Sequence, residues 1–112
     1  MISGLSHISL ITRDLAKMTR IIIEALSGKE IYDSGEKQFF FSHEKFFRVD
    51  EIWIAVTEGV SLPSRTYNHI AFKTDEAGLE NAKAAIANLN LEIKPPRPRV
   101  EGEGQSVYFY TI

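Results

Sequence analysis

Apolar and polar residues alternate in the first patterned stretch of the chain, GLSHISLIT at positions 4–12. His7 falls on one side of an extended backbone, and large apolar side chains such as Ile8 fall on the other. The stretch YNHIAFK at positions 67–73 repeats this arrangement around a second histidine, His69. The alternation predicts two strands, each with a histidine on one face and an apolar layer behind it.

Each predicted strand is followed by apolar residues at helical spacing. They recur at relative offsets of 0, 3, 7 and 10, which places them on one face of a helix. These residues are Leu15, Met18, Ile22 and Ala25 in the first helix, and Leu79, Ala82, Ile86 and Leu89 in the second, predicted over 76–89. Asp14 and Asp75 precede the two helices. Gly28 and Asn90 follow them, and we expect both to end a helix in the left-handed conformation.

Two features of the pattern, a histidine and a glutamate, each recur after the same number of residues. His69 follows His7 by 62 positions, and Glu92 follows Glu30 by the same 62 positions. A shared spacing at independent landmarks indicates an internal duplication.

The duplication divides a single domain into two modules, residues 1–60 and 61–112. The first module has the order strand–helix–strand–strand–strand. The second follows the same order but reaches residue 112 before its last strand, so the pattern predicts that this strand is missing. The later predicted strands are 30–32, 38–42 and 51–59 in the first module, and 91–94 and 106–110 in the second.

Composition narrows the class of protein. The 112 residues suit one domain, and 44 % apolar with 25 % charged residues is typical of soluble globular proteins. A formal charge of −2 argues against nucleic-acid or anionic-membrane binding. No apolar run approaches the roughly 20 residues of a membrane helix, and no signal peptide is evident, so we expect a cytoplasmic protein. With no cysteine, a metal would need nitrogen and oxygen ligands.

The chain has three histidines. A single histidine on a strand is most often a packed or edge residue. Two at equivalent positions of a duplicated unit can converge near a pseudo-twofold axis, where His7 and His69 would suit manganese, iron, nickel, zinc or copper. Both interpretations remain open on the pattern alone. His43 lies beside Glu44 and Lys45, and we expect it to face solvent.

Two further features carry candidate chemistry. Glu44 stands in FFFSHEKFF, and a carboxylate among phenylalanine rings is a stronger base than one in water. The alternative is a surface glutamate on an edge strand. The proline-rich segment PPRPRVEGEG at 95–104 is either a connector or a rim loop, in which Arg97 and Arg99 offer positive charge to an anion.

Four segments together resemble the fosfomycin-resistance epoxide hydrolases of the vicinal oxygen chelate superfamily, relatives of glyoxalase I. They are GLSHISLI, EIYDSGEKQFFFSHEKFF, RTYNHIAFK and PPRPRVEGEGQSVYFY. The resemblance implies an α+β fold of paired βαβββ modules. It also implies a homodimer in which a module of each chain surrounds a divalent metal, usually Mn(II). His7 and His69 match the metal ligands, which come from different chains.

The resemblance further implies hydration of the oxirane of fosfomycin, a small phosphonate. Glu44 matches the base that takes a proton from the attacking water. Ser106 and Tyr108 match positions near the phosphonate. We add Ser9, which shares the face of His7, and the two arginines named above as further substrate-binding candidates.

The family's third metal ligand is a glutamate in the strand that follows the segment matching SVYFY. The 112 residues end before that strand, so we expect two imidazoles to bind metal weakly and activity to be doubtful. The rival hypothesis is a non-catalytic protein of the same fold that sequesters a small molecule in the dimer cleft, as bleomycin-resistance proteins do. A structural remnant with altered assembly is the third.

Overall fold

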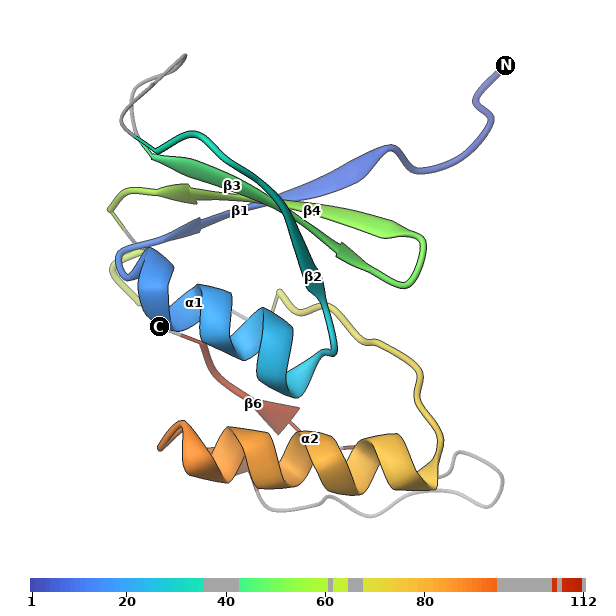
Figure 1. Cartoon of the computed structure of the whole chain (residues 1–112), viewed down its shortest axis with the longest axis vertical. Helices are drawn as coiled ribbons and strands as arrows, with labels where there is room; N and C mark the ends of the chain where they lie inside the picture. The colour runs from blue at the N-terminus through green and yellow to red at the C-terminus, as the bar shows by residue number, and fades with distance from the viewer. Residues whose placement is uncertain (36–42, 61, 65–67, 95–105, 107, 112) are drawn as a thin grey trace.

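The computed structural model describes residues 1–35, 43–60, 62–64, 68–94, 106 and 108–111. The first module contains β1 (His7–Thr12), α1 (Leu15–Arg20), η1 (Ile21–Ala25), β2 (Lys29–Asp33), β3 (Glu44–Val49) and β4 (Ile52–Glu58). The second contains α2 (Glu76–Asn88), β5 (Ile93–Lys94) and β6 (Tyr108–Phe109). Helices and strands mix as the α+β prediction requires (Figure 1).

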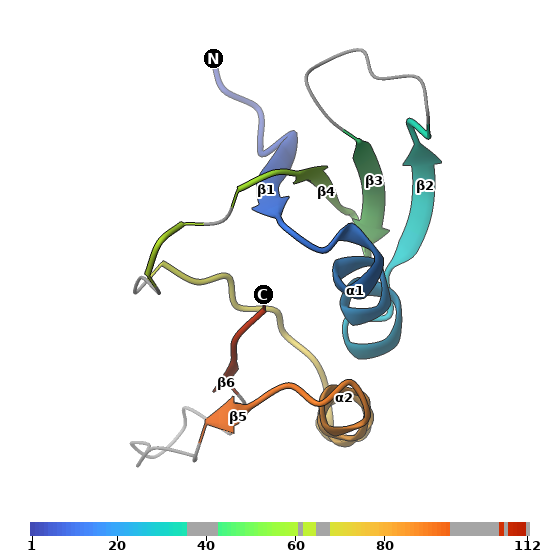
Figure 2. The same cartoon turned by 90° about the vertical axis from the view of Figure 1, so that its left-hand side faces the viewer.

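The first module forms a four-stranded sheet with the order β1-β4-β3-β2. β1 pairs with β4 in parallel, whereas β4–β3 and β3–β2 are antiparallel. α1 and η1 cover one face of this sheet (Figure 2). In this strand order, β1 lies at one edge of the sheet. Its partner is β4, so the first and last strands of the module are neighbours.

The first helix packs as its sequence predicts, and the structure shows how it begins. The Asp14 carboxylate caps it by accepting the Lys17 amide at 3.0 Å. All four residues of the predicted apolar face are buried: Leu15, Met18, Ile22 and Ala25. The final turn is a π-helix over Ile21–Ala25, which continues α1 onto the sheet.

The helix stops before Gly28, as expected, and the Gly28 amide donates to the Ile22 carbonyl at 2.8 Å, but the left-handed residue is Ser27 (φ 56°). Gly28 is needed for space instead. A Cβ there would lie 2.6 Å from Cγ2 of Ile22 and 3.1 Å from Cγ2 of Val49. The glycine therefore lets the chain leave the helix in close contact with the core.

The core lies between α1, η1 and the covered face of the sheet. Its largest fully buried side chains include Phe47 on β3 and Ile54 on β4. Leu89, after α2, joins the same cluster, and Phe72 and Phe109 of the second module pack against it. Burial of this apolar surface is the main stabilising term of the fold and ties the second module to the first.

The second module repeats some features of the first. Asp75 caps α2 by accepting the Gly78 amide at 2.8 Å, and Asn90 is left-handed (φ 59°), as predicted. Lys94 pairs with Tyr108, 62 positions after the pair of Tyr32 with Phe46. The neighbouring pairs differ, because Ile93 pairs with Phe109 whereas Phe47 pairs with Glu30 across an irregularity in β2. One strand pair is therefore equivalent in the two modules.

The strand predicted at 67–73 is wrong, because the described part of this segment, 68–73, has no regular secondary structure. A strand depends on ladder hydrogen bonds to a neighbour, as β1 has to β4, and no described strand pairs with residues 68–73. Alternation of side chains alone therefore does not make this segment a strand.

The remaining strand predictions differ in length. The predicted 30–32 and 51–59 correspond to β2 and β4, while 91–94 and 106–110 shorten to the two-residue strands β5 and β6. The strand predicted at 38–42 lies outside the described residues. Across the described residues, the helices are too short and too polar to span a bilayer.

Candidate functional site

The face of the four-stranded sheet opposite α1 and η1, here called the open face, carries the candidate site of the first module. Its side chains form three rows set by strand register, because paired residues point to the same side of a sheet. The rows are His7–Trp53–Arg48, Ser9–Ala55–Phe46 and Ile11–Thr57–Glu44. The predicted metal ligand His7, the predicted substrate-binding residue Ser9 and the predicted base Glu44 therefore lie on the same face of the sheet.

His7 and Ser9 are exposed at the edge of this face, while the intervening Ile8 and the following Leu10 turn toward the core side. The hydroxyl oxygen of Ser6 lies 3.0 Å from Nδ1 of His7. A hydrogen bond at Nδ1 leaves Nε2, at the tip of the ring, for a metal or substrate.

Glu44 is fixed at its backbone and at its carboxylate. Its amide donates to the hydroxyl of the buried Ser34 at 2.9 Å, and its carbonyl accepts the Ser34 amide at 2.9 Å. The Thr57 hydroxyl donates to Oε2 of Glu44 at 3.2 Å. The carboxylate is half-buried and shares its face with the ring of Phe46, as the sequence suggested. Such a group can accept a proton from a bound water.

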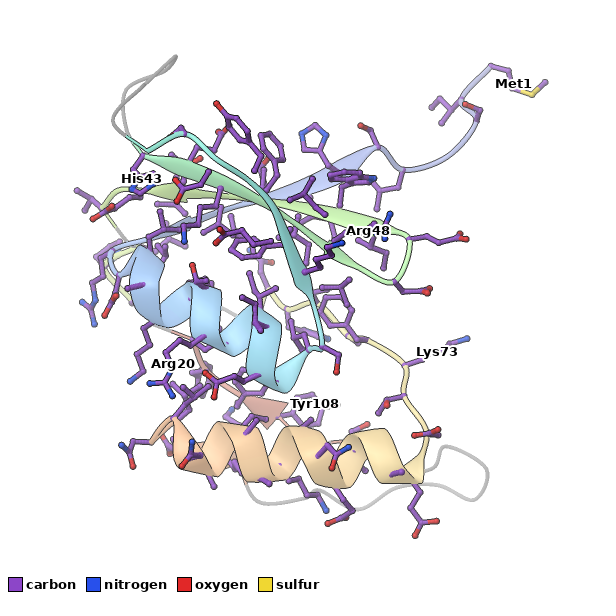
Figure 3. All side chains as sticks on the ribbon, in the orientation of Figure 1. Met1, Arg20, His43, Arg48, Lys73 and Tyr108 are labelled. Atoms are coloured by element: carbon purple, nitrogen blue, oxygen red, sulfur yellow. The ribbon has the colours of Figure 1, made fainter. Side chains whose placement is uncertain are left out.

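Sequence reasoning missed several residues of the open face. Tyr32 and Phe46 pack with ring centroids 5.8 Å apart, and Trp53 lies partly exposed between His7 and Arg48. The exposed Arg48 lies near the end of β3 (Figure 3). Alternation along β3 and β4 would have found Phe46, Arg48 and Trp53, since each is two or four positions from a residue on the same face.

The candidate residues of the second module are less closely assembled. His69 is exposed on the irregular segment, Ser106 is half-buried, and Tyr108 is half-buried on β6. Arg97 and Arg99 lie outside the described residues. Within the part of one chain that the structure describes, no three histidine or carboxylate side chains gather closely enough to hold a metal ion.

His43 does not simply face solvent, contrary to the sequence expectation. It is half-buried on the helix side of the sheet, where Nε2 makes a short hydrogen bond to the Asp33 carboxylate. The same carboxylate accepts the Gly35 amide at 2.8 Å and lies 3.8 Å from Nζ of Lys45. The hydrogen bond from His43, then that from Gly35, lowers the pKa of Asp33. This network joins the ends of β2 and β3 on the face away from the candidate site.

Comparison with known proteins decides the family. The chain is 50 % identical over 110 residues to the fosfomycin resistance protein FosX of Mesorhizobium japonicum, covering 98 % of this chain and 79 % of that protein. It is 52 % identical over 110 residues to FosX of Listeria monocytogenes, covering 98 % and 83 %. The chain belongs to the FosX family of fosfomycin resistance proteins. No family model matches the sequence.

Solved FosX structures have the same fold. A Listeria monocytogenes FosX variant, complexed with Mn(II) and 1S,2S-dihydroxypropylphosphonic acid, matches with a TM-score of 0.87 and 51 % identity over 98 % of this chain and 85 % of that one. FosX from Mesorhizobium loti matches with a TM-score of 0.84 and 45 % identity over 98 % and 84 %. A glyoxylase/bleomycin resistance protein/dioxygenase domain from Frankia, at 18 % identity and a TM-score of 0.64, shares the fold alone. These matches confirm the vicinal oxygen chelate fold.

Proposed function

We propose that the chain adds water to the epoxide of fosfomycin, with Mn(II) as the metal. The main support is the identity of about half of its residues with FosX proteins over 98 % of its length. The Listeria relative carries Mn(II) and a dihydroxypropylphosphonic acid. That compound is the diol expected when water opens the ring of a propylphosphonate epoxide.

The donor chemistry of the chain fits this metal. We assign His7 and His69 as its ligands, since imidazole nitrogen is among the donors that bind first-row divalent cations. Both side chains are exposed, and Ser6 engages Nδ1 of His7 so that Nε2 is left for coordination. When bound, Mn(II) supplies Lewis-acid polarisation of the substrate oxygens.

We propose that the site lies between two copies of the chain. In one chain, Glu44 and His7 occupy different rows of the open face and strands that are separated by β4. His69 belongs to the other module, on a segment that pairs with no strand among the described residues. A homodimer that pairs the first module of one chain with the second module of the other brings these groups to one cavity.

We assign a separate role in the reaction to each of the candidate residues. Glu44 accepts a proton from the attacking water, which makes the oxygen a better nucleophile toward the ring carbon. Ser9, Ser106 and Tyr108 offer hydroxyl groups to the phosphonate oxygens. Arg97 and Arg99 offer it positive charge.

Turnover without thiol tests the proposal. Purified chain is incubated with fosfomycin and Mn(II), and ³¹P NMR follows conversion to the diol. We expect conversion that a chelator abolishes. Fosfomycin that is bound but not consumed would support the sequestering protein instead, and neither binding nor turnover would support the remnant.

The three histidines supply matched variants for the metal assignment. Mn(II) in excess over its Kd should raise the Tm of the wild-type protein, because the ligand binds the folded state. His7→Ala and His69→Ala should lose this increase, whereas His43→Ala should keep it. An increase retained in both His7→Ala and His69→Ala would overturn the assignment.

Mixing the two inactive variants tests the shared site. A dimer of His7→Ala with His69→Ala has one site with both histidines and one with neither. A refolded equimolar mixture should recover about a quarter of wild-type turnover if chains pair at random. No recovery would place both ligands of a site in the same chain.

A further inference from the structure

A side-chain hydrogen bond joins β3 and β4 at the predicted base. Glu44 and Thr57 are register partners on the open face, and the Thr57 hydroxyl donates to Oε2 of Glu44 at 3.2 Å. Both side chains are half-buried, so water competes less with this bond than it would at a fully exposed pair.

The charged neighbours of Glu44 in the sequence do not take this role. His43 and Lys45 lie on the opposite face, as alternation along a strand requires. His43 is hydrogen-bonded to Asp33, and Lys45 pairs with Glu30 at 2.7 Å. Orientation of the carboxylate therefore comes from across the strand pair rather than from its neighbours along the chain.

We infer that Thr57 is a positioning residue for the base. The inference rests on the proposed function, in which Glu44 accepts the proton of the attacking water. One carboxylate oxygen is held by the hydroxyl, and the backbone is held by Ser34 at two points. The other oxygen, Oε1, is then presented to the water with few torsions left to sample.

Two substitutions separate the hydroxyl from the shape of the side chain. Thr57→Val keeps the branched shape that suits a strand and removes the donor, while Thr57→Ser keeps the donor. Loss of this hydrogen bond to the carboxylate should lower kcat by about tenfold in Thr57→Val, with KM little changed. Thr57→Ser should keep most of the wild-type kcat.

The pH dependence gives a signature that a purely structural role would not produce. A donor stabilises the ionised carboxylate, so its loss makes the carboxylate bind a proton more readily. The acid limb of the kcat profile should therefore move to higher pH in Thr57→Val and stay near the wild-type position in Thr57→Ser.

A readout that needs neither metal nor turnover tests the same contact. In metal-free protein labelled with ¹³C at glutamate side chains, the Glu44 carboxyl resonance is assigned by its loss in Glu44→Gln. Its titration midpoint should rise in Thr57→Val. Thr19→Val is the matched control, because the Thr19 hydroxyl donates to the Leu15 carbonyl on α1 at 2.7 Å, away from the open face.

The outcomes distinguish this inference from the proposed function. Wild-type protein that does not consume fosfomycin overturns the proposed function, and the NMR titration still decides the contact. Wild-type turnover with an unchanged kcat profile and an unchanged Glu44 titration in Thr57→Val overturns the inference. A loss equal in Thr57→Val and Thr57→Ser would also overturn it, since the hydroxyl would then not be the cause.

Discussion

The two modules share one equivalent strand pair but differ in how much strand they form. Tyr32 pairs with Phe46 in the first module, and Lys94 pairs with Tyr108 at the equivalent place in the second. Among the described residues, the first module forms a four-stranded sheet and the second forms one ribbon of two-residue strands. The helices begin alike, so the difference lies in strand partners. A helix makes its backbone hydrogen bonds within itself, whereas a strand makes them with a neighbouring strand.

The modules also differ in the chemistry of equivalent positions. His7 and His69 match, but Ser106 stands 62 positions after Glu44, and Tyr108 stands 62 positions after Phe46. In the proposed mechanism, the first module supplies the base and the second supplies neutral hydroxyl groups. Under this proposal, the two copies keep equivalent imidazoles and differ in their other roles.

Substitution of the two equivalent residues Glu44 and Ser106 gives the largest expected contrast. Glu44→Gln keeps an oxygen that can accept from Thr57 but cannot take the water's proton. Turnover should fall by at least about 100-fold with the Tm unchanged. Ser106→Ala should mainly raise KM for fosfomycin, because a phosphonate contact is lost. Steady-state kinetics by ³¹P NMR measures both, and a greater loss of kcat in Ser106→Ala would reverse the assignment.

Truncation of equivalent phenylalanines compares the packing of the modules. Phe47 on β3 is fully buried, and Phe109, 62 positions later on β6, is half-buried. Phe47→Ala should lower the free energy of unfolding by about 3–5 kcal/mol. Phe109→Ala should cost about 1–2 kcal/mol, because less apolar surface is lost. Urea denaturation measures the two, and equal costs would show that both copies are equally packed.

The helix caps should behave alike in the two modules. Asp14 accepts the Lys17 amide and Asp75 accepts the Gly78 amide, each three residues on. Alanine at either position should cost about 1 kcal/mol, and asparagine should restore most of it, since its side-chain oxygen also caps. Thermal unfolding of the four variants checks this, and a cap that matters in one module alone would contradict the likeness.

The Asp33 network should give the smallest effect and is specific to the first module. At the positions 62 residues after Asp33, His43 and Lys45, the chain has Pro95, Gln105 and Val107, none of which is charged. Because His43 and Gly35 lower the pKa of Asp33, its carboxylate stabilises the fold above about pH 3.9, the ordinary value for aspartate. That contribution is lost as the pH falls through the lower, folded-state pKa.

Asp33→Asn should therefore reduce the difference in stability between pH 7 and pH 3. Screening keeps the change small, since the Asp33 side chain is 39 % exposed. Asp50→Asn is the matched control, because Asp50 lies in the β3–β4 turn with φ 54°, which asparagine also tolerates. Chemical denaturation at the two pH values measures both variants, and equal responses would show that the network contributes no pH dependence.

The sequence predicted what depends on local spacing. The helix faces, the left-handed Asn90 after α2 and the histidine-bearing face of β1 follow from local sequence signals within a few residues. The duplication followed from His7 and Glu30 recurring at one interval. The family resemblance, carried by long runs around His7 and Glu44, is confirmed by the FosX relatives.

What the sequence did not predict depends on register between distant segments. The strand at 67–73 had the correct alternation, but alternation does not supply a partner strand. The contact of Thr57 with Glu44 joins residues 13 positions apart and exists only because β3 and β4 pair in this register. His43 meets Asp33 for the same reason, since β2 and β3 bring their ends together.

The two-point hold of Ser34 on Glu44 has a consequence for how independent this position is of its own side chain. Ser34 precedes the connection from β2 to β3, and Glu44 follows it, so the two hydrogen bonds join the ends of these strands. On the Glu44 side both bonds are made by backbone atoms. A different side chain at position 44 therefore leaves this anchor available, and the functional group can change without a change in strand pairing.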